Sequence, residues 1–425
     1  RRMSDADTPL AEQPWHKAIF TRQMFICVLT GIASGLPLYF LIQLVPAWLR
    51  SEGVGLTEIG LFALVGFPYN WKFIWAPLMD RYVPPFLGRR RGWMLITQIA
   101  LMLSMAALGF IDPKVSVGLV AYVAAGVAFF SASQDVVLDA YRRELLKDEE
   151  LGLGNAIHVQ AYRLAGLVPG SLGVIMGDYL PWSTVFMVMA GFMAIGVAMT
   201  LWVSEASDAS VAPLTLRAAV VEPFREFVLR RGLGSALLLL SFLFLYKLGD
   251  NMATALSSPF YLDIGFSLTE IGTIAKTASL TAAIIGGLVG GVIMIRLGIN
   301  RALWVFGFVQ VASILGFAAL AEIGPNRLAL TLVIVFEYLG VGLGTAAFTA
   351  FIARATTPAY AATQFALFTA LAALPRTFAN ATTGWIVEAI GWTNFYLFCT
   401  ALAVPGMLML FKVAPWSEPS DAQSS

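Results

Sequence analysis

The pentapeptide Leu56-Thr57-Glu58-Ile59-Gly60 recurs unchanged as Leu268-Thr269-Glu270-Ile271-Gly272, 212 residues further along the chain. Each copy opens an apolar segment that is long enough to cross a membrane as a helix, which takes about 20 residues. Arg163 and Arg376 are related by nearly the same spacing. Matches that share one spacing indicate that the chain consists of two halves of similar structure.

The composition indicates that most of the protein surface faces lipid. Of the 425 residues, 58% are hydrophobic and 12% are charged, whereas soluble proteins carry about 25% charged residues. Apolar runs separated by polar or Gly/Pro clusters predict an all-α membrane protein with twelve transmembrane helices, six in each half. We expect these helices near residues 24–49, 56–79, 93–110, 115–140, 155–176, 182–203, 233–256, 268–294, 302–321, 328–353, 363–386 and 393–411.

The predicted helices divide the chain into five parts. These are an amino tail at 1–23, a six-helix bundle at 24–203, a linker at 204–232, a second six-helix bundle at 233–411 and a carboxyl tail at 412–425. In the linker, residues 220–229 mix phenylalanines with charged residues, which is typical of an amphipathic surface helix. A plain connection without a helix is the alternative.

Lysine and arginine are distributed unevenly between the two sides of the predicted membrane domain. The two tails and the loops after the even-numbered helices hold 19 of the 27 lysines and arginines, whereas the opposite loops hold only Arg50, Lys114 and Arg327. Because cytoplasmic loops carry the excess of positive charge, we expect both termini in the cytoplasm. The net charge is only +1, so nucleic acid is not an expected partner, whereas membrane lipids are.

Charged side chains interrupt the predicted helices. The cations are Lys72, Arg163, Lys247, Lys276 and Arg376, and the acids are Asp135, Asp139, Asp250 and Glu337. A charge that faces lipid at the centre of a membrane helix costs roughly 2.5 to 3.5 kcal/mol, so these groups should face one another or a water-filled cavity. Static ion pairs between helices are one reading. The surplus of cations favours a cavity that binds anions.

Four acids are candidates for carrying a transported proton. Asp135 and Asp139 lie four residues apart and therefore on one helix face, where lost hydration and mutual repulsion favour a bound proton. Asp250 lies three residues from Lys247, which should keep it ionised. Glu337 has no partner that the sequence identifies. We therefore expect Asp135, coupled to Asp139, to carry the proton, with Glu337 ahead of Asp250 as the alternative.

Polar and aromatic residues near the cations are expected to line the cavity. Aromatic faces combined with amide and hydroxyl groups suit sugars and peptides, although a single tyrosine can equally serve packing or anchoring. The expected substrate-binding residues are Lys72, Tyr69, Asn70, Gln134, Tyr162, Arg163, Tyr246, Lys247, Lys276, Gln364, Arg376 and Asn380.

The loops after the second and eighth predicted helices have related compositions. The first contains Asp80 and Arg81 followed by Arg89, Arg90 and Arg91, and the second contains Arg296 and Arg301. Arginines can bind carboxylates and the carboxyl ends of helices, and such contacts can hold one conformation of a transporter. We expect a conformational latch here. A signal for membrane topology alone is the alternative.

Sequence signatures of enzymes are missing. The chain has no HExxH, Walker or GxSxG motif and no cluster of cysteine and histidine. Cys27 and Cys399 both lie in apolar runs and are expected to be small buried hydrophobic residues. We therefore expect a transporter rather than an enzyme, without a cofactor or metal and driven by an ion gradient, since one charge that crosses 100 mV releases about 2.3 kcal/mol.

Several segments resemble the AmpG muropeptide permeases of Gram-negative bacteria, a family of the major facilitator superfamily. They are residues 72–82 (KFIWAPLMDRY), 84–93 (PPFLGRRRGW), 131–140 (SASQDVVLDA) and 246–250 (YKLGD), and the resemblance extends from about 24 to 411. It implies the major facilitator fold in a bacterial inner membrane, and we expect a monomer. It also implies proton-driven import of N-acetylglucosaminyl-anhydro-N-acetylmuramyl peptides from periplasm to cytoplasm, for peptidoglycan recycling and β-lactamase induction.

Other functions are compatible with part of these features. The segment 131–140 also resembles the acetyl-coenzyme A transporters, so another proton-coupled permease of this superfamily is an alternative. A membrane receptor that does not transport is a second alternative, because one fold can serve unrelated functions. The charges in both halves argue against a receptor, which has no need to bear their desolvation cost.

Overall fold

The computed structural model describes residues 20–75, 79, 82–146, 151–205, 225–355, 368, 373 and 376–417. These residues are helical or in turns, and no strand occurs within these ranges. Nine of the helices described are long and apolar enough to cross a membrane. Contacts divide the chain into a first unit, Arg1–Val45 with Trp71–Pro213, and a second unit, Pro46–Asn70 with Leu214–Ser425. An all-helical membrane protein is what the sequence predicts.

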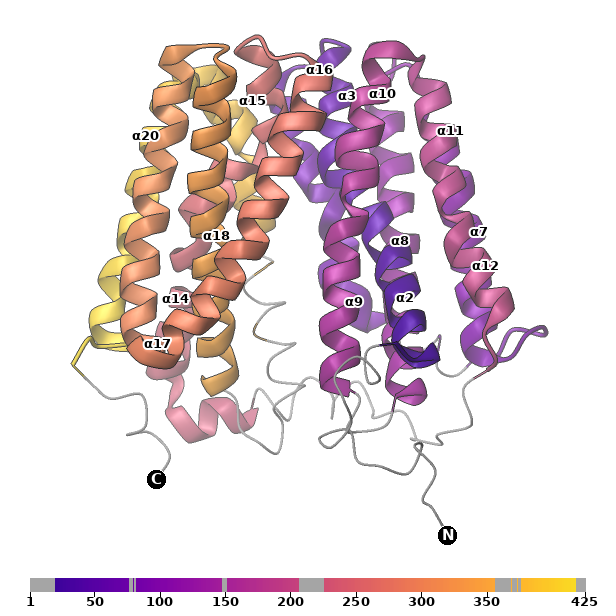
Figure 1. Cartoon of the computed structure of the whole chain (residues 1–425), viewed down its shortest axis with the longest axis horizontal. Helices are drawn as coiled ribbons and strands as arrows, with labels where there is room; N and C mark the ends of the chain where they lie inside the picture. The colour runs from indigo at the N-terminus through magenta and orange to yellow at the C-terminus, as the bar shows by residue number, and fades with distance from the viewer. Residues whose placement is uncertain are drawn as a thin grey trace. The chain divides into compact units, whose positions relative to one another are not determined.

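The first unit is built around two sets of neighbouring helices (Figure 1). In one set, α2 packs against α8, α9 and α12, and in the other, α7 packs against α8, α11 and α12. The elements are α2 (Arg22–Tyr39), the π-helical turn η2 (Phe40–Leu44), η4 (Lys72–Ile74), α7 (Arg89–Leu108), α8 (Val117–Leu145), α9 (Leu151–Ala165), η5 (Val168–Gly173), α10 (Val174–Tyr179), α11 (Trp182–Phe192) and α12 (Ala194–Trp202).

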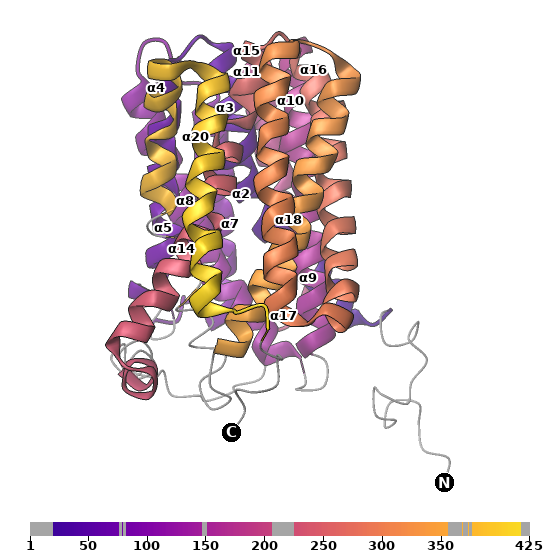
Figure 2. The ribbon, with the colours of Figure 1, turned by 90° about the vertical axis from the view of Figure 1, so that its left-hand side faces the viewer.

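In the second unit, α17 packs against both α18 and α20 (Figure 2). Its elements are α3 (Val45–Ser51), α4 (Leu56–Leu61), η3 (Phe62–Gly66), α5 (Phe67–Trp71), α14 (Leu233–Ala255), α15 (Ser257–Asp263), α16 (Leu268–Glu270), η6 (Ile271–Ala275), α17 (Lys276–Ile323), α18 (Arg327–Ala355) and α20 (Thr383–Val413). α17 turns at Gly298 and α20 at Gly391, where φ is 75° and 79°. Glycine adopts such angles readily, so each label covers two successive helices.

The observed helices agree with the expected ones where both can be compared. The fourth expected helix, 115–140, corresponds to Val117–Leu145, and the tenth, 328–353, to Arg327–Ala355. In the eleventh, 363–386, most residues before Arg376 lie outside the described residues. A helix over 225–231 places Phe227 in the core against Phe368, which favours the helical reading of the linker. Both cysteines are buried, as expected.

The repeated pentapeptide begins a helix in both places. In the second copy the Ser267 hydroxyl accepts a hydrogen bond from the Glu270 amide while the Glu270 carboxylate accepts one from the Ser267 amide. This reciprocal capping satisfies two amide groups that a helix start leaves without partners. In the first copy Gly55 occupies the capping position and has no hydroxyl, although Glu58 keeps the acidic first turn. The repeat therefore has a structural explanation and does not by itself mark a ligand site.

Residues 46–70 follow α2 in the chain, yet their contacts place them in the second unit. The Arg50 guanidinium binds the Asp263 carboxylate through two hydrogen bonds of 2.6 and 2.9 Å, and the Trp392 indole donates to the same carboxylate at 3.0 Å. α4 also packs against α20 at Gly60 and Gly384. The division into bundles at 24–203 and 233–411 stays a prediction from the internal repeat.

The close contact between α4 and α20 predicts that Gly384→Ala destabilises the protein. A Cβ atom at position 384 would lie 1.7 Å from the Leu56 carbonyl oxygen, a backbone atom that cannot rotate away. Overpacking of this kind costs about 1 to 3 kcal/mol. We expect a lower midpoint of thermal unfolding in detergent, followed by tryptophan fluorescence. Gly287→Ala is the control, because a Cβ there meets no atom within 4 Å. Equal midpoints for the two variants would contradict the packing argument.

Candidate functional site

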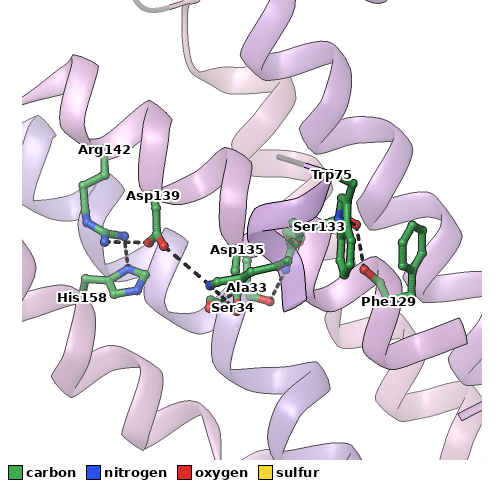
Figure 3. A network of polar contacts seen from close by, with 11 residues as sticks. Ala33, Ser34, Trp75, Phe129, Ser133, Asp135, Asp139, Arg142 and His158 are labelled. Carbon is green, nitrogen blue, oxygen red and sulfur yellow. Dashed lines mark hydrogen bonds and ion pairs between the residues drawn. The ribbon is translucent and has the colours of Figure 1, made fainter. Parts of the chain in front are cut away.

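A polar network in the first unit centres on Asp135 of α8 (Figure 3). Its carboxylate accepts a hydrogen bond of 2.5 Å from the Ser34 hydroxyl of α2. The Lys72 ammonium lies 4.0 Å from the nearest oxygen of Asp135 and 4.0 Å from that of Asp139. One cation therefore faces two carboxylates that lie one helical turn apart. The sequence predicted the two acids on one face, and the structure adds Lys72 and Ser34 to them.

The network continues from Asp139 to a histidine of α9, as Figure 3 shows. Arg142 donates to the Asp139 carboxylate at 2.9 Å and contacts Nδ1 of His158 at 2.9 Å. A guanidinium can only donate hydrogen bonds, so Nδ1 must accept one and His158 is neutral with its proton on Nε2. The Thr30 hydroxyl lies 3.0 Å from the same nitrogen. A chain of polar groups thus joins α2, α8 and α9.

Sequence reasoning did not select His158, which is buried. The available signal was its spacing: His158 precedes Tyr162 by four residues and so lies on the same face of the predicted helix. The ring of Tyr162 packs against Tyr39, with 5.5 Å between the centroids. Arg163 is partly buried and forms no ion pair within the described residues. Gln134 donates from its amide to the Ala33 carbonyl at 2.8 Å and so attaches α8 to α2.

The arginines of the expected latch bind groups inside their own units. Arg90 donates to Glu144 at 2.7 Å, and the closest distance from Arg89 to this carboxylate is 3.7 Å. Arg91 donates to the Thr200 carbonyl at 2.9 Å, near the carboxyl end of α12. In the second unit, the Arg301 guanidinium lies 5.7 Å from the ring of Trp416, and Arg296 is exposed.

These arginines make the contacts with carboxylates and helix ends that their residue type favours. Asp80 and Arg81, the other two members of the expected latch, lie outside the described residues. The contacts that are described hold helices of one unit together and do not test a change of conformation. The latch role stays a prediction.

A second polar network lies in the second unit and is more deeply buried. The Lys247 ammonium donates to Asp250 at 2.8 Å and to the Gln310 amide oxygen at 3.1 Å. The pairing of Lys247 with Asp250 is the one that the sequence predicted. Glu337 has no exposed surface, accepts a hydrogen bond from the Ser313 hydroxyl and lies within hydrogen-bonding reach of Asp250. Sequence reasoning missed these partners because they come from other helices.

The remaining expected residues lie in different surroundings. Tyr246, expected to line a cavity, lies instead in the core of the second unit: its hydroxyl donates to the Leu303 carbonyl at 2.8 Å and its ring stacks on Phe348. Lys276 is buried and forms no ion pair with any described residue. Arg376 lies near enough to Asp250 to interact electrostatically with it.

Three further residues complete the expected set. Asn70 donates to the Thr377 hydroxyl at 3.2 Å. Asn380 has a buried amide oxygen without a hydrogen-bond partner among the described residues, and Tyr69 is partly buried. Gln364 lies outside the described residues. Each unit therefore holds at least one lysine beside a pair of carboxylates, together with cations that have no acidic partner in the part described.

This arrangement suits the binding of protons and of anionic groups. In each unit a lysine faces a carboxylate whose charge a proton could cancel, and Arg163 and Lys276 offer positive charge without a described counter-charge. Among the residues described, no group of three or more His, Cys, Asp or Glu side chains is placed to hold a metal ion.

Comparison with known sequences identifies relatives along the whole chain. The family model of the Major Facilitator Superfamily matches residues 27–380. The anhydromuropeptide permease of Escherichia coli K12 is 43% identical over 387 residues, which are 91% of this chain and 78% of that protein. An uncharacterized protein of Haemophilus influenzae is 48% identical over 96% of this chain and 98% of its own length. A Rickettsia felis protein that carries the AmpG name is 28% identical over 91% and 95% of the two chains.

Comparison with solved structures supports the same fold. The nucleoside transporter NupG superimposes with a TM-score of 0.73 at 12% identity and covers 92% of this chain and 99% of its own. A D-xylose–proton symporter superimposes with a TM-score of 0.70 at 12% identity and covers 95% and 98%. Identities this low show the fold alone. The family match and the close relative together show that the chain belongs to the major facilitator superfamily and, within it, to the family of the AmpG permeases.

Proposed function

We propose that the protein is a proton-coupled importer of anhydro-muropeptides that works by alternating access. It would carry N-acetylglucosaminyl-anhydro-N-acetylmuramyl peptides from the periplasm to the cytoplasm, for peptidoglycan recycling and β-lactamase induction. The observation that carries this proposal is the 43% identity to the E. coli anhydromuropeptide permease over 91% of the chain. The protein would act as a monomer in a bacterial inner membrane with both termini in the cytoplasm, and it would not be an enzyme.

The described cations support an anionic substrate. A muropeptide carries the carboxylates of its stem peptide, and a buried cation without a counter-ion is costly unless it binds an anion at some stage. Arg163 in the first unit and Lys276 in the second have no ion pair among the described residues. Lys72 lies 4.0 Å from each of two carboxylates, a distance that leaves its ammonium group without a short ionic hydrogen bond.

The contacts of Asp135 support its role in proton coupling. When Asp135 is ionised, its negative charge attracts Lys72 across the 4.0 Å gap. A proton on Asp135 would remove that attraction and leave Lys72 to Asp139 or to a substrate carboxylate. A proton that binds one conformation more strongly shifts the population toward that conformation. The geometry supports a link between protonation of Asp135 and the position of Lys72, the cation that we propose binds substrate.

Uptake into proteoliposomes tests the proposed function. Purified protein in vesicles with an alkaline interior should accumulate a radiolabelled disaccharide anhydro-muropeptide above the level of empty vesicles, because protons that flow inward supply the free energy. Collapse of the proton gradient with an ionophore should abolish the accumulation. Acetyl-coenzyme A, offered under the same conditions, tests the alternative substrate. Muropeptide levels that stay equal in loaded and empty vesicles would show that the substrate is wrong.

Neutralising the first-unit cations should weaken substrate binding. Hydrogen bonds to charged groups contribute about 1.5 to 3 kcal/mol, so Lys72→Gln and Arg163→Gln should each raise the dissociation constant by roughly tenfold or more. Isothermal titration calorimetry with the purified variants measures this directly. Lys114→Gln, which removes an exposed cation in a loop, should bind as the wild type does. The assignment is wrong if both helix variants keep the wild-type affinity.

Replacing Asp135 should uncouple transport from the proton gradient. Asp135→Asn cannot release a proton but keeps a similar shape, so we expect it to lose accumulation while it retains exchange of substrate between equal pools. Glu337→Gln should keep both activities if Asp135 is the carrier. Both variants are compared in the same proteoliposomes under an imposed gradient. Accumulation by Asp135→Asn against a substrate gradient would place the coupling elsewhere.

A further inference from the structure

Two buried carboxylate oxygens in the second unit have no hydrogen-bond donor among the described residues. Oδ1 of Asp250 and Oε1 of Glu337 are both buried, and neither has a hydrogen-bond partner among the described residues. The other oxygen of each group is bound: Oδ2 of Asp250 accepts from Lys247 at 2.8 Å, and Oε2 of Glu337 accepts from the Ser313 hydroxyl. The two carboxyl groups lie within hydrogen-bonding reach of each other.

Full ionisation of this pair is physically unfavourable. Each acceptor left without a donor costs about 1 to 3 kcal/mol, and more when it is charged. Two negative charges in contact also repel each other strongly in a medium that excludes water. A single proton shared by the two carboxyl groups removes both problems, because it cancels one charge and supplies the donor that the two oxygens lack.

The surroundings decide which residue holds the proton. Asp250 has the Lys247 ammonium in direct contact and Arg376 nearby, and both cations stabilise its negative charge. Tyr246, on the same helix, adds no charge. Glu337 interacts electrostatically with Asp250 and Lys247, but the Lys247 ammonium is hydrogen-bonded to Asp250. Its other neighbours carry no charge, namely Ser313, Tyr261, Tyr338, Tyr396 and Cys399. A neutral Glu337 beside an ionised Asp250 therefore fits both environments.

We propose that Asp250 and Glu337 share one proton, carried on Oε1 of Glu337 and donated to Oδ1 of Asp250, which makes the pair a second proton-binding site separate from Asp135. Glu337 is then a positioning residue. Its O–H group holds the Asp250 carboxylate so that the other oxygen meets Lys247, and Lys247 in turn keeps its contact with Gln310. This goes beyond the proposed function, because it holds whichever solute is carried.

Infrared spectroscopy of the purified protein at pH 7, without solute, tests the shared proton. A protonated carboxyl group has a C=O stretching band, which ionised carboxylates lack and which shifts when H₂O is replaced by D₂O. We expect this band in the wild type, its loss in Glu337→Gln and its retention in Asp135→Asn. The absence of the band from the wild type would overturn the proposal, as would an unchanged band in Glu337→Gln.

Thermal unfolding of two Glu337 variants provides a second test of the shared proton, which applies even if one variant folds poorly. The amide of Glu337→Gln can donate to Asp250 while its oxygen accepts from Ser313, so the midpoint of thermal unfolding should stay near that of the wild type. Glu337→Leu has no donor, so its midpoint should fall by several degrees as Asp250 loses its partner. Equal midpoints for the two variants would contradict the donor role. Neither measurement uses a solute, so a failure of muropeptide uptake would leave this result standing.

Discussion

A charge inside a membrane protein needs a partner in the protein, in a water-filled cavity or in a bound solute, because lipid offers neither counter-ions nor hydrogen bonds. This constraint explains why Lys72 lies beside Asp135 and Asp139, and why Lys247 lies beside Asp250. Polar groups of different helices can meet only where the helices approach closely, and small residues at helix crossings allow this approach. A Cβ at Gly31 of α2 would lie 2.4 Å from the His158 carbonyl of α9, and only such close approach lets Thr30 contact the His158 ring.

The two polar networks differ in their access to solvent. In the first unit, the side chains of Asp139, Lys72 and Asp135 are 53%, 33% and 15% exposed. In the second unit, the side chains of Asp250 and Lys247 are 6% and 13% exposed, and Glu337 has no exposed surface. Exposed carboxylates can exchange protons with water directly, whereas sealed ones cannot until the helices around them move. The first network is therefore suited to rapid protonation and the second to retention of a proton.

The sequence predicted the features that depend on local pattern. The spans follow from runs of apolar residues, and the contact of Lys247 with Asp250 follows from the three-residue spacing on one helix. Contacts between helices could not be predicted in this way. Glu337 meets Asp250 and Ser313 only through the packing of α14, α17 and α18, and Tyr246 was assigned to a cavity because periodicity does not tell a core face from a cavity face.

The segment 46–70 is bounded at both ends by backbone that departs from the regular α-helix. The π-helical turn Phe40–Leu44 precedes it, and the 3₁₀ turn Lys72–Ile74 follows it, after Trp71 with φ −111° and ψ 5°. Fewer well-aligned hydrogen bonds resist bending at such turns than within a regular helix. The chain can therefore bend more easily at these two turns than within a regular helix. A force that reaches the segment through the Arg50–Asp263 ion pair would bend the chain at turns of this kind before it bends a regular helix.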